Sequence, residues 1–348
     1  MWGLIAPTGS MKLVRTSMKI FKMRNFGIIA LLSLLALVGC NHSTPIEPMD
    51  ELREIGFAGY AQQINRSLVE NLEDLQEQEL KLYGSYTLDG NTARLFDAER
   101  LFYDSTLPGW DYTTTQYWMM GASYHFYSLS PYTTYCTFSE TQNAVTILDY
   151  ESSTDSEDLL YATASRDLSV AADFSAVMFQ FRHACAAVQF NLVNASNSVL
   201  TDVRNIRLVG LYNKGNFRFA ADGSAAWTLN TSTTIQPNAD VQPFAGVCIL
   251  PEGGLPVNLT VEHPLYENGA ILVLPQSIYK SSVTLHLEYK KAGDSEYAIR
   301  DIQLGMLGGV TPTEWKAGEL YKYKLNITDN TITAEVTVVD WVDDYVDL

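Results

Sequence analysis

Basic residues, cysteines and enzyme signature motifs are all scarce in this 348-residue chain. It holds 23 lysines and arginines against 40 aspartates and glutamates, which gives a net charge of −17. Nucleic-acid phosphates and anionic lipid surfaces both attract lysine and arginine, so this balance argues against either as a docking partner. A negative surface keeps an exported protein soluble and says little about its fold.

Only four cysteines are present, Cys40, Cys136, Cys185 and Cys248. Their spacing contains no CxxC pair and no Cys/His cluster of the kind that binds zinc or exchanges disulfides. The last three are far apart in the chain and allow one disulfide at most. We expect these three to act as small buried hydrophobic residues.

Motifs of the common enzyme families are missing as well. The chain has no HExxH, GxSxG, GxGxxG or GxxxxGK[ST] sequence. Its five histidines are scattered, with none four residues from another, and single histidines rarely mark a site. We therefore predict no catalytic residue, no metal ligand and no cofactor site. The histidines are His42, His125, His183, His263 and His286.

Two features leave a binding role open. The acidic stretch 149–158 (DYESSTDSED) has oxygen ligands for calcium, but it lacks the glycine and the spacing of an EF-hand, which favours a solvated loop. A dense aromatic group would stack on sugar rings if it were exposed, whereas aromatic residues are also standard strand and core residues, the interpretation we favour. The group comprises Trp110, Tyr112, Tyr117, Trp118, Tyr124, Phe126, Tyr127, Tyr132 and Tyr135.

The apolar run at residues 26–40 (FGIIALLSLLALVGC) is too short for a comfortable membrane span, with about fifteen residues against about twenty. Five basic residues and no acidic one precede it, the pattern of a secretory signal peptide covering residues 1–39. Its Leu-Val-Gly-Cys ending resembles the bacterial lipobox, which implies a lipidated Cys40 as the first mature residue. The alternative is an ordinary signal peptide with an incidental cysteine.

Removal of the five basic residues with the signal lowers the net charge from −17 to −22. Several acyl chains on Cys40 would anchor the mature chain stably in the membrane. Residues 40–53 contain two prolines and few apolar groups, so we interpret them as a tether.

From residue 54 onward, short apolar or aromatic runs alternate with turn residues at about ten-residue spacing, which is typical of an all-β sandwich. No alternation of strands and helices indicates a Rossmann or barrel fold. We expect a first strand over 54–60, a short helix or loop to about residue 78, and a turn at Asp89-Gly90. Near the end we expect a hairpin around 316–318 and a last strand that carries Ile332, Ala334, Val336 and Val338 on one face. A polar stretch at 194–198 divides the predicted domains, 54–195 and 196–348.

In their order along the chain, several segments resemble the fimbrillin family, the pilins of lipoprotein-derived type V pili in Bacteroidetes. The resemblance covers nearly the whole mature chain. The segments, after the lipobox at Cys40, are EIGFAGYAQQINRS, GWDY, QYWMMGASYHFYSLSP, FRHACAAVQFNLVN, NIRLVGLYNKGNFRF, VLPQS, WKAGELYKYKLNIT and TVVDW.

The resemblance implies two tandem transthyretin-like, Greek-key β-sandwich domains and a structural role in a surface fimbrium, held at the outer membrane by lipid. In this family a trypsin-like protease cuts after an arginine and removes the first strand, here 54–66. Arg66, followed by Ser67, matches best, with Arg53 as the competing site. The groove then accepts a C-terminal donor strand of the next subunit, for which Ile332, Ala334, Val336 and Val338 are the candidates.

Two departures from the family pattern leave alternatives open. Only seven residues follow Trp341, and they are acidic (VDDYVDL), which suits a tip or accessory adhesin that does not donate a strand. No acidic run follows Cys40, so surface display is less firmly implied than membrane attachment. The expected partners are other pilin subunits, the protease, and a surface glycan or protein. The alternatives are a non-polymerising glycan-binding lipoprotein and an extracellular hydrolase, which would need converging carboxylates.

Overall fold

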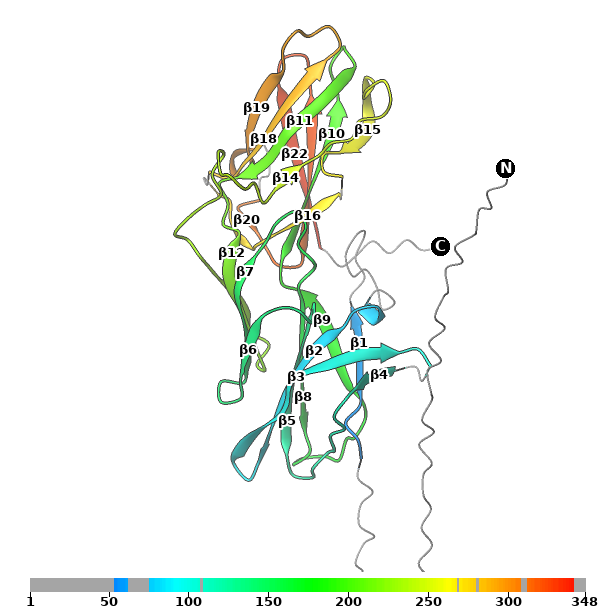
Figure 1. Cartoon of the computed structure of the whole chain (residues 1–348), viewed down its shortest axis with the longest axis vertical. Coiled ribbons are helices and arrows are strands. Elements are labelled where there is room, and N and C mark those ends of the chain that lie inside the picture. The colour runs from blue at the N-terminus through cyan, green and yellow to red at the C-terminus, as the bar shows by residue number, and fades with distance from the viewer. Residues whose placement is uncertain are drawn as a thin grey trace, which may run out of the picture. The chain divides into compact units, whose positions relative to one another are not determined.

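The computed structural model describes residues 53–61, 75–106, 109–267, 269–279, 282–307 and 312–340. These residues form β-strands joined by turns, with helical residues only at 75–76 and in the short 3₁₀ helix η1 (Leu304–Met306) (Figure 1). The chain is therefore all-β, as the sequence predicts. Within the described ranges no helix is long and apolar enough to cross a membrane. Cys40, Arg66 and Ser67 lie outside the described residues.

Seven strands of the first half pair in a closed barrel, in the order β1-β4-β3-β2-β5-β8-β9 and back to β1. Neighbours are antiparallel except for β1 and β9, which run parallel. The strands are β1 (Phe57–Ala61), β2 (Leu80–Leu88), β3 (Asn91–Asp104), β4 (Gly109–Tyr112), β5 (Ser123–Ser130), β8 (Leu160–Asp167) and β9 (Val177–His183).

The alternation of residue types along β9 shows why this segment is a strand with one buried face. Val177, Phe179 and Phe181 are buried, whereas the residues between them are exposed. Side chains of a strand point to opposite faces in turn, so the apolar residues all enter the core of the barrel. The turn predicted at Asp89-Gly90 is present, and both residues have positive φ, 51° and 77°, as a tight hairpin turn requires.

A separate sheet has the order β13-β12-β7-β6 and joins segments that are distant in sequence. Its strands are β6 (Cys136–Ser139), β7 (Ala144–Glu151), β12 (Lys214–Ala220) and β13 (Ala225–Leu229). Strand β12 follows the predicted domain boundary at 195/196, yet it pairs with β7, which precedes it. Strand pairing therefore crosses that boundary.

The second half contains two larger sheets that share one core. One contains β10 (Ala186–Asn194), β15 (Asn258–Pro264), β16 (Ala270–Val273), β21 (Glu319–Ile327) and β22 (Ile332–Asp340). The other contains β11 (Leu200–Val209), β14 (Ala245–Gly246), β18 (Thr284–Lys291) and β19 (Ala298–Gln303). Buried side chains of both sheets meet between them, as in a β-sandwich.

The hairpin predicted around Lys316–Gly318 is wrong. Strand β20 (Glu314–Trp315) pairs with β17 (Gln276–Ser277), and β21 pairs with β10 and β22. Both edges of β21 are therefore occupied, and Trp315 is buried with its indole N–H donating to the Tyr323 hydroxyl at 3.0 Å. Strand β2 begins at Leu80, which confirms the strand predicted after about residue 78; residues 75 and 76 before it are helical.

Candidate functional site

The first strand, β1, closes the barrel by lying between β9 and β4 (Figure 1). It pairs with β9 over five residues, from Phe57 opposite Val177 to Ala61 opposite Phe181, and with β4 through Phe57 opposite Trp110. Strand β1 thus covers one edge of β9 and one edge of β4, and both edges would be unpaired without it.

Two side chains of this segment are part of the barrel core. Ile55 is 1% exposed and Phe57 is 5% exposed. Four aromatic rings surround the ring of Phe57, and it stacks on one and meets three edge to face. The ring centroids lie at 5.7 Å for Phe96 and Phe179, 5.6 Å for Tyr112 and 5.5 Å for Phe126. The first strand therefore contributes Phe57 to an aromatic cluster as well as pairing its backbone.

Residues just before β1 are held by several backbone hydrogen bonds. The amide of Ile55 donates to the Gln116 carbonyl at 2.9 Å, and the amide of Val177 donates to the Gly56 carbonyl at 2.8 Å. The Arg53 carbonyl accepts from the Trp118 amide at 2.9 Å, and its guanidinium lies 4.5 Å from the ring centroid of Phe174. A protease that cuts after Arg53 would have to break this hydrogen bond first.

The C-terminal strand β22 is an edge strand. It pairs with β21 over nine residues, from Glu319 opposite Asp340 to Ile327 opposite Ile332. Of the predicted donor residues, Ile332, Ala334 and Val336 are half-buried against the core of their own sandwich, and Val338 is 44% exposed.

The structure also brings together Asp158, His183 and Cys185, a set that residue spacing did not reveal. Asp158 Oδ2 lies 2.8 Å from His183 Nδ1, and both residues are buried. Cysteine, histidine and aspartate are also the residue types of a nucleophilic triad, in which the histidine ring contacts the thiol. Burial raises the pKa of the Cys185 thiol far above its usual range, and the nearby Asp158 carboxylate raises it further. A raised pKa lowers the thiolate fraction and so argues against Cys185 as a nucleophile.

The alternation of buried and exposed residues along β9 is a sequence signal that could have identified His183 as buried. His183 continues the buried face of Val177, Phe179 and Phe181, so the alternation places an ionisable ring in the core. A buried histidine needs a polar partner, and Asp158 supplies it. The three described cysteines are free, with Cys185 buried and the other two half-buried.

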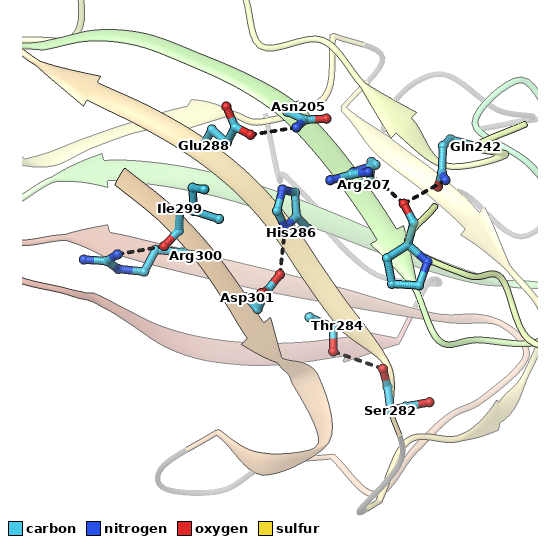
Figure 2. A network of polar contacts seen from close by, with 11 residues as sticks. Asn205, Arg207, Gln242, Ser282, Thr284, His286, Glu288, Ile299, Arg300 and Asp301 are labelled. Atoms are coloured by element: carbon cyan, nitrogen blue, oxygen red, sulfur yellow. Dashed lines mark hydrogen bonds and ion pairs between the residues drawn. The ribbon is translucent and has the colours of Figure 1, made fainter. Parts of the chain in front are cut away.

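A polar network covers the outer side of the sheet formed by β14, β11, β18 and β19 (Figure 2). His286 Nδ1 lies 2.7 Å from Asp301 Oδ1, and Glu288 accepts hydrogen bonds from Asn205 at 2.8 Å and Arg204 at 2.9 Å. These two bonds lower the pKa of the Glu288 carboxyl. Asp301 and Glu288 each have a polar partner on a neighbouring strand, so the network links three strands of this sheet.

The other described histidines also have protein partners. His125 Nδ1 lies 2.9 Å from Ser165 Oγ, and His263 Nε2 lies 2.8 Å from the Ile249 carbonyl oxygen. Among the described residues, no group of three or more His, Cys, Asp and Glu is arranged to hold a metal ion.

The aromatic group divides into a large buried part and a small exposed part. Its five most buried members confirm the core interpretation: Trp110, Trp118, Tyr124, Phe126 and Tyr127. Tyr117 and Tyr135 are exposed. Tyr135 lies beside the acidic stretch 149–158, with which it lines a surface cleft.

A family model described as fimbrillin-like matches residues 75–341, more than half of the chain. The chain belongs to the fimbrillin-like family. The resemblance predicted from sequence is confirmed, and the family supports a pilus-related adhesin role at the cell surface with other pilin subunits as partners. A search of curated proteins found no match to the sequence.

One solved structure with a TM-score above 0.5 has the same fold. A fimbrial protein from Bacteroides vulgatus is 17% identical, with 83% of this chain and 99% of that chain covered, and its TM-score of 0.52 shows a shared fold. Two others have lower TM-scores. They are a fimbrial assembly protein from Parabacteroides distasonis (12% identity, 83% and 100% covered, TM-score 0.38) and the C-terminally truncated tip fimbrial protein Mfa3 from Porphyromonas gingivalis (10% identity, 83% and 100% covered, TM-score 0.39).

Proposed function

We propose that this fimbrillin-like protein is a lipid-anchored pilus subunit, or a tip or accessory adhesin, that joins the fibre by strand exchange. The observation that supports this proposal is the position of β1. This strand completes the barrel between β9 and β4 and places Ile55 and Phe57 in its core. A subunit that carries such a strand at its N-terminus stays closed until the strand is released.

Release of β1 begins with cleavage after Arg66 by a trypsin-like protease. A cut after Arg53 would leave residues 54–61, including β1, attached to the body. A cut after Arg66 separates β1 from the rest of the chain, so only non-covalent contacts hold it. A strand of another subunit can then replace it, because β4 and β9 offer unpaired N–H and C=O groups together with the aromatic cluster.

The donor in this proposal is the C-terminal strand of the next subunit. Donation by β22 would require it to leave β21, with which it pairs over nine residues. A subunit that keeps β22 in its own sheet would accept a strand without donating one, which is the behaviour of a tip or accessory adhesin. Neither role needs a catalytic residue, and we propose that the protein is not an enzyme.

The test uses the soluble chain from Cys40 onward, without lipid, treated with limiting trypsin and followed by intact mass and electron microscopy. A single cut after Arg66 with fibres supports a stalk subunit. The same cut without fibres supports a tip or accessory subunit. The Arg66→Ala variant should resist this cut, and Arg53→Ala should behave as the parent chain. Normal fibre assembly by uncut Arg66→Ala would refute the proposed activation.

A further inference from the structure

A surface cleft of about 490 Å³ lies between the β5–β6 connection, strand β7 and the β7–β8 loop. This volume is within the range of small-ligand sites. The residues that line it include Tyr135 from the β5–β6 connection, Asp149 and Glu151 from β7, and Asp155 and Glu157 from the β7–β8 loop. None of the lining residues belongs to β1, β4, β9 or β22. The cleft is therefore separate from the elements of the proposed strand exchange.

The walls of the cleft are held in place by hydrogen bonds to other segments. The Leu148 amide donates to the Tyr135 carbonyl at 3.3 Å, and the Ser152 amide donates to the Asn213 carbonyl at 2.8 Å. The Thr154 amide donates to the Pro243 carbonyl at 2.9 Å. A site with fixed walls loses little conformational freedom when a ligand binds.

Asp149 interrupts the regular pairing of β7. Its φ is 52°, and the register between β7 and β12 shifts between Gly215 and Phe217. Its amide donates to the Asn216 side-chain oxygen at 2.8 Å. Irregularities of this kind re-aim a side chain, and Asp149 lines the cleft.

The charged side chains that line the cleft are all carboxylates. Glu151 is paired with Lys214, whose Nζ lies 2.9 Å away. The carboxylates of Asp149, Asp155 and Glu157 have no side-chain partner within the described part of the chain. A ligand of this cleft must therefore bring hydrogen-bond donors and must not carry negative charge.

Tyr135 supplies an apolar surface next to these acceptors. Tyr135 is 69% exposed, in contrast to the buried aromatic residues of the barrel. A tyrosine ring packs well against the C–H face of a pyranose, whose hydroxyl groups then point toward neighbouring polar groups. Hydroxyls for this purpose come from Thr133, Thr134, Ser153 and Ser156.

We propose that this cleft binds an uncharged sugar residue, a hexose or an N-acetylhexosamine, of a surface glycan. The sugar stacks on Tyr135 and donates hydroxyl hydrogen bonds to Asp149, Asp155 and Glu157. The carboxylates exclude sialylated and sulfated sugars by charge repulsion. The hydroxyl groups of Thr133, Thr134, Ser153 and Ser156 favour a sugar over a basic peptide, because a sugar both donates and accepts hydrogen bonds and a cationic side chain only donates them.

The test applies the soluble chain from Cys40 onward to an array of neutral, sialylated and sulfated glycans, followed by titration calorimetry with a neutral glycan that binds. Tyr135→Ala and Asp149→Asn should each weaken binding about tenfold, from the loss of stacking and of a charge-assisted hydrogen bond. Asparagine tolerates the positive φ at position 149, so the fold should be retained. Tyr279→Ala removes another exposed tyrosine and should bind as the parent chain does.

The proposal is overturned if no neutral glycan binds, if the cleft variants bind as the parent chain does, or if acidic glycans are preferred. Hexalysine is the probe for a basic peptide. Binding of hexalysine that the cleft variants abolish, without glycan binding, would assign the cleft to basic peptides instead. Fibre formation by Tyr135→Ala should be unchanged, so failure here and failure of strand exchange give different results.

Discussion

Phe57 contributes more to the barrel core than any other described side chain of the first strand, because four aromatic rings surround it. Phe57→Ala should lower the free energy of unfolding by about 3–5 kcal/mol, the usual cost of removing a buried phenylalanine. Urea denaturation of the uncleaved soluble chain measures the change. Met178→Ala is the matched control, since Met178 lies on the neighbouring strand but is 55% exposed. Equal unfolding midpoints for the two variants would contradict the role given to Phe57.

Cys248 and Cys185 should react with iodoacetamide more slowly than a solvent-exposed thiol does. Burial raises the pKa of Cys248 to about 11, so its thiolate fraction, and hence its alkylation rate, should rise about tenfold per pH unit from pH 8 to 10. A model thiol with a pKa near 8.5 levels off over the same range. Cys185 should stay unlabelled until the protein unfolds, because it is fully buried. Peptide mass spectrometry measures both rates, and rapid labelling of native Cys185 would contradict the description of its surroundings.

At the scale of single elements, β22 has two possible roles that residue-specific changes can separate. Val336 packs on the sandwich core of its own subunit, whereas Val338 is 44% exposed there. Val336→Ala should therefore destabilise the monomer by about 1–2 kcal/mol, and Val338→Ala should change stability by less than about 0.5 kcal/mol. Chemical denaturation measures these values.

The same two variants report on donation. If β22 inserts into the next subunit, Val338→Ala should slow fibre growth although it leaves the monomer stable. Unchanged growth with Val338→Ala would indicate that β22 remains in its own sheet, as an accessory subunit would keep it.

At the scale of the whole molecule, charge opposes self-assembly. The mature chain predicted from Cys40 onward carries a net charge of −22, so neighbouring subunits repel one another at low ionic strength. The screening length falls from about 30 Å at 0.01 M salt to about 10 Å at 0.1 M. Fibre formation by the cleaved chain should therefore be faster at the higher salt concentration. Light scattering at several sodium chloride concentrations measures the rate, and slower assembly in salt would show that attractive charge pairs dominate the contact.

Much of the local structure could be predicted from residue order alone. The alternation of Val177, Phe179 and Phe181 predicts a one-sided strand, and Asp89-Gly90 predicts a hairpin turn, because side-chain direction and backbone dihedral angles are local properties. The all-β class and the fimbrillin resemblance follow from such patterns repeated along the chain. The role of the first strand was predicted by resemblance, and its exchange remains a proposal.

Strand partners and side-chain clusters were decided by the tertiary structure. Strand β1 pairs in parallel with β9, about 120 residues further along the chain, and β20 pairs with β17 instead of forming a hairpin with β21. Tyr135 and the acidic stretch meet at one cleft, and Asp158 meets His183, for the same reason. These contacts depend on which distant surfaces fit together and bury apolar area, a property of the folded chain that no single segment contains.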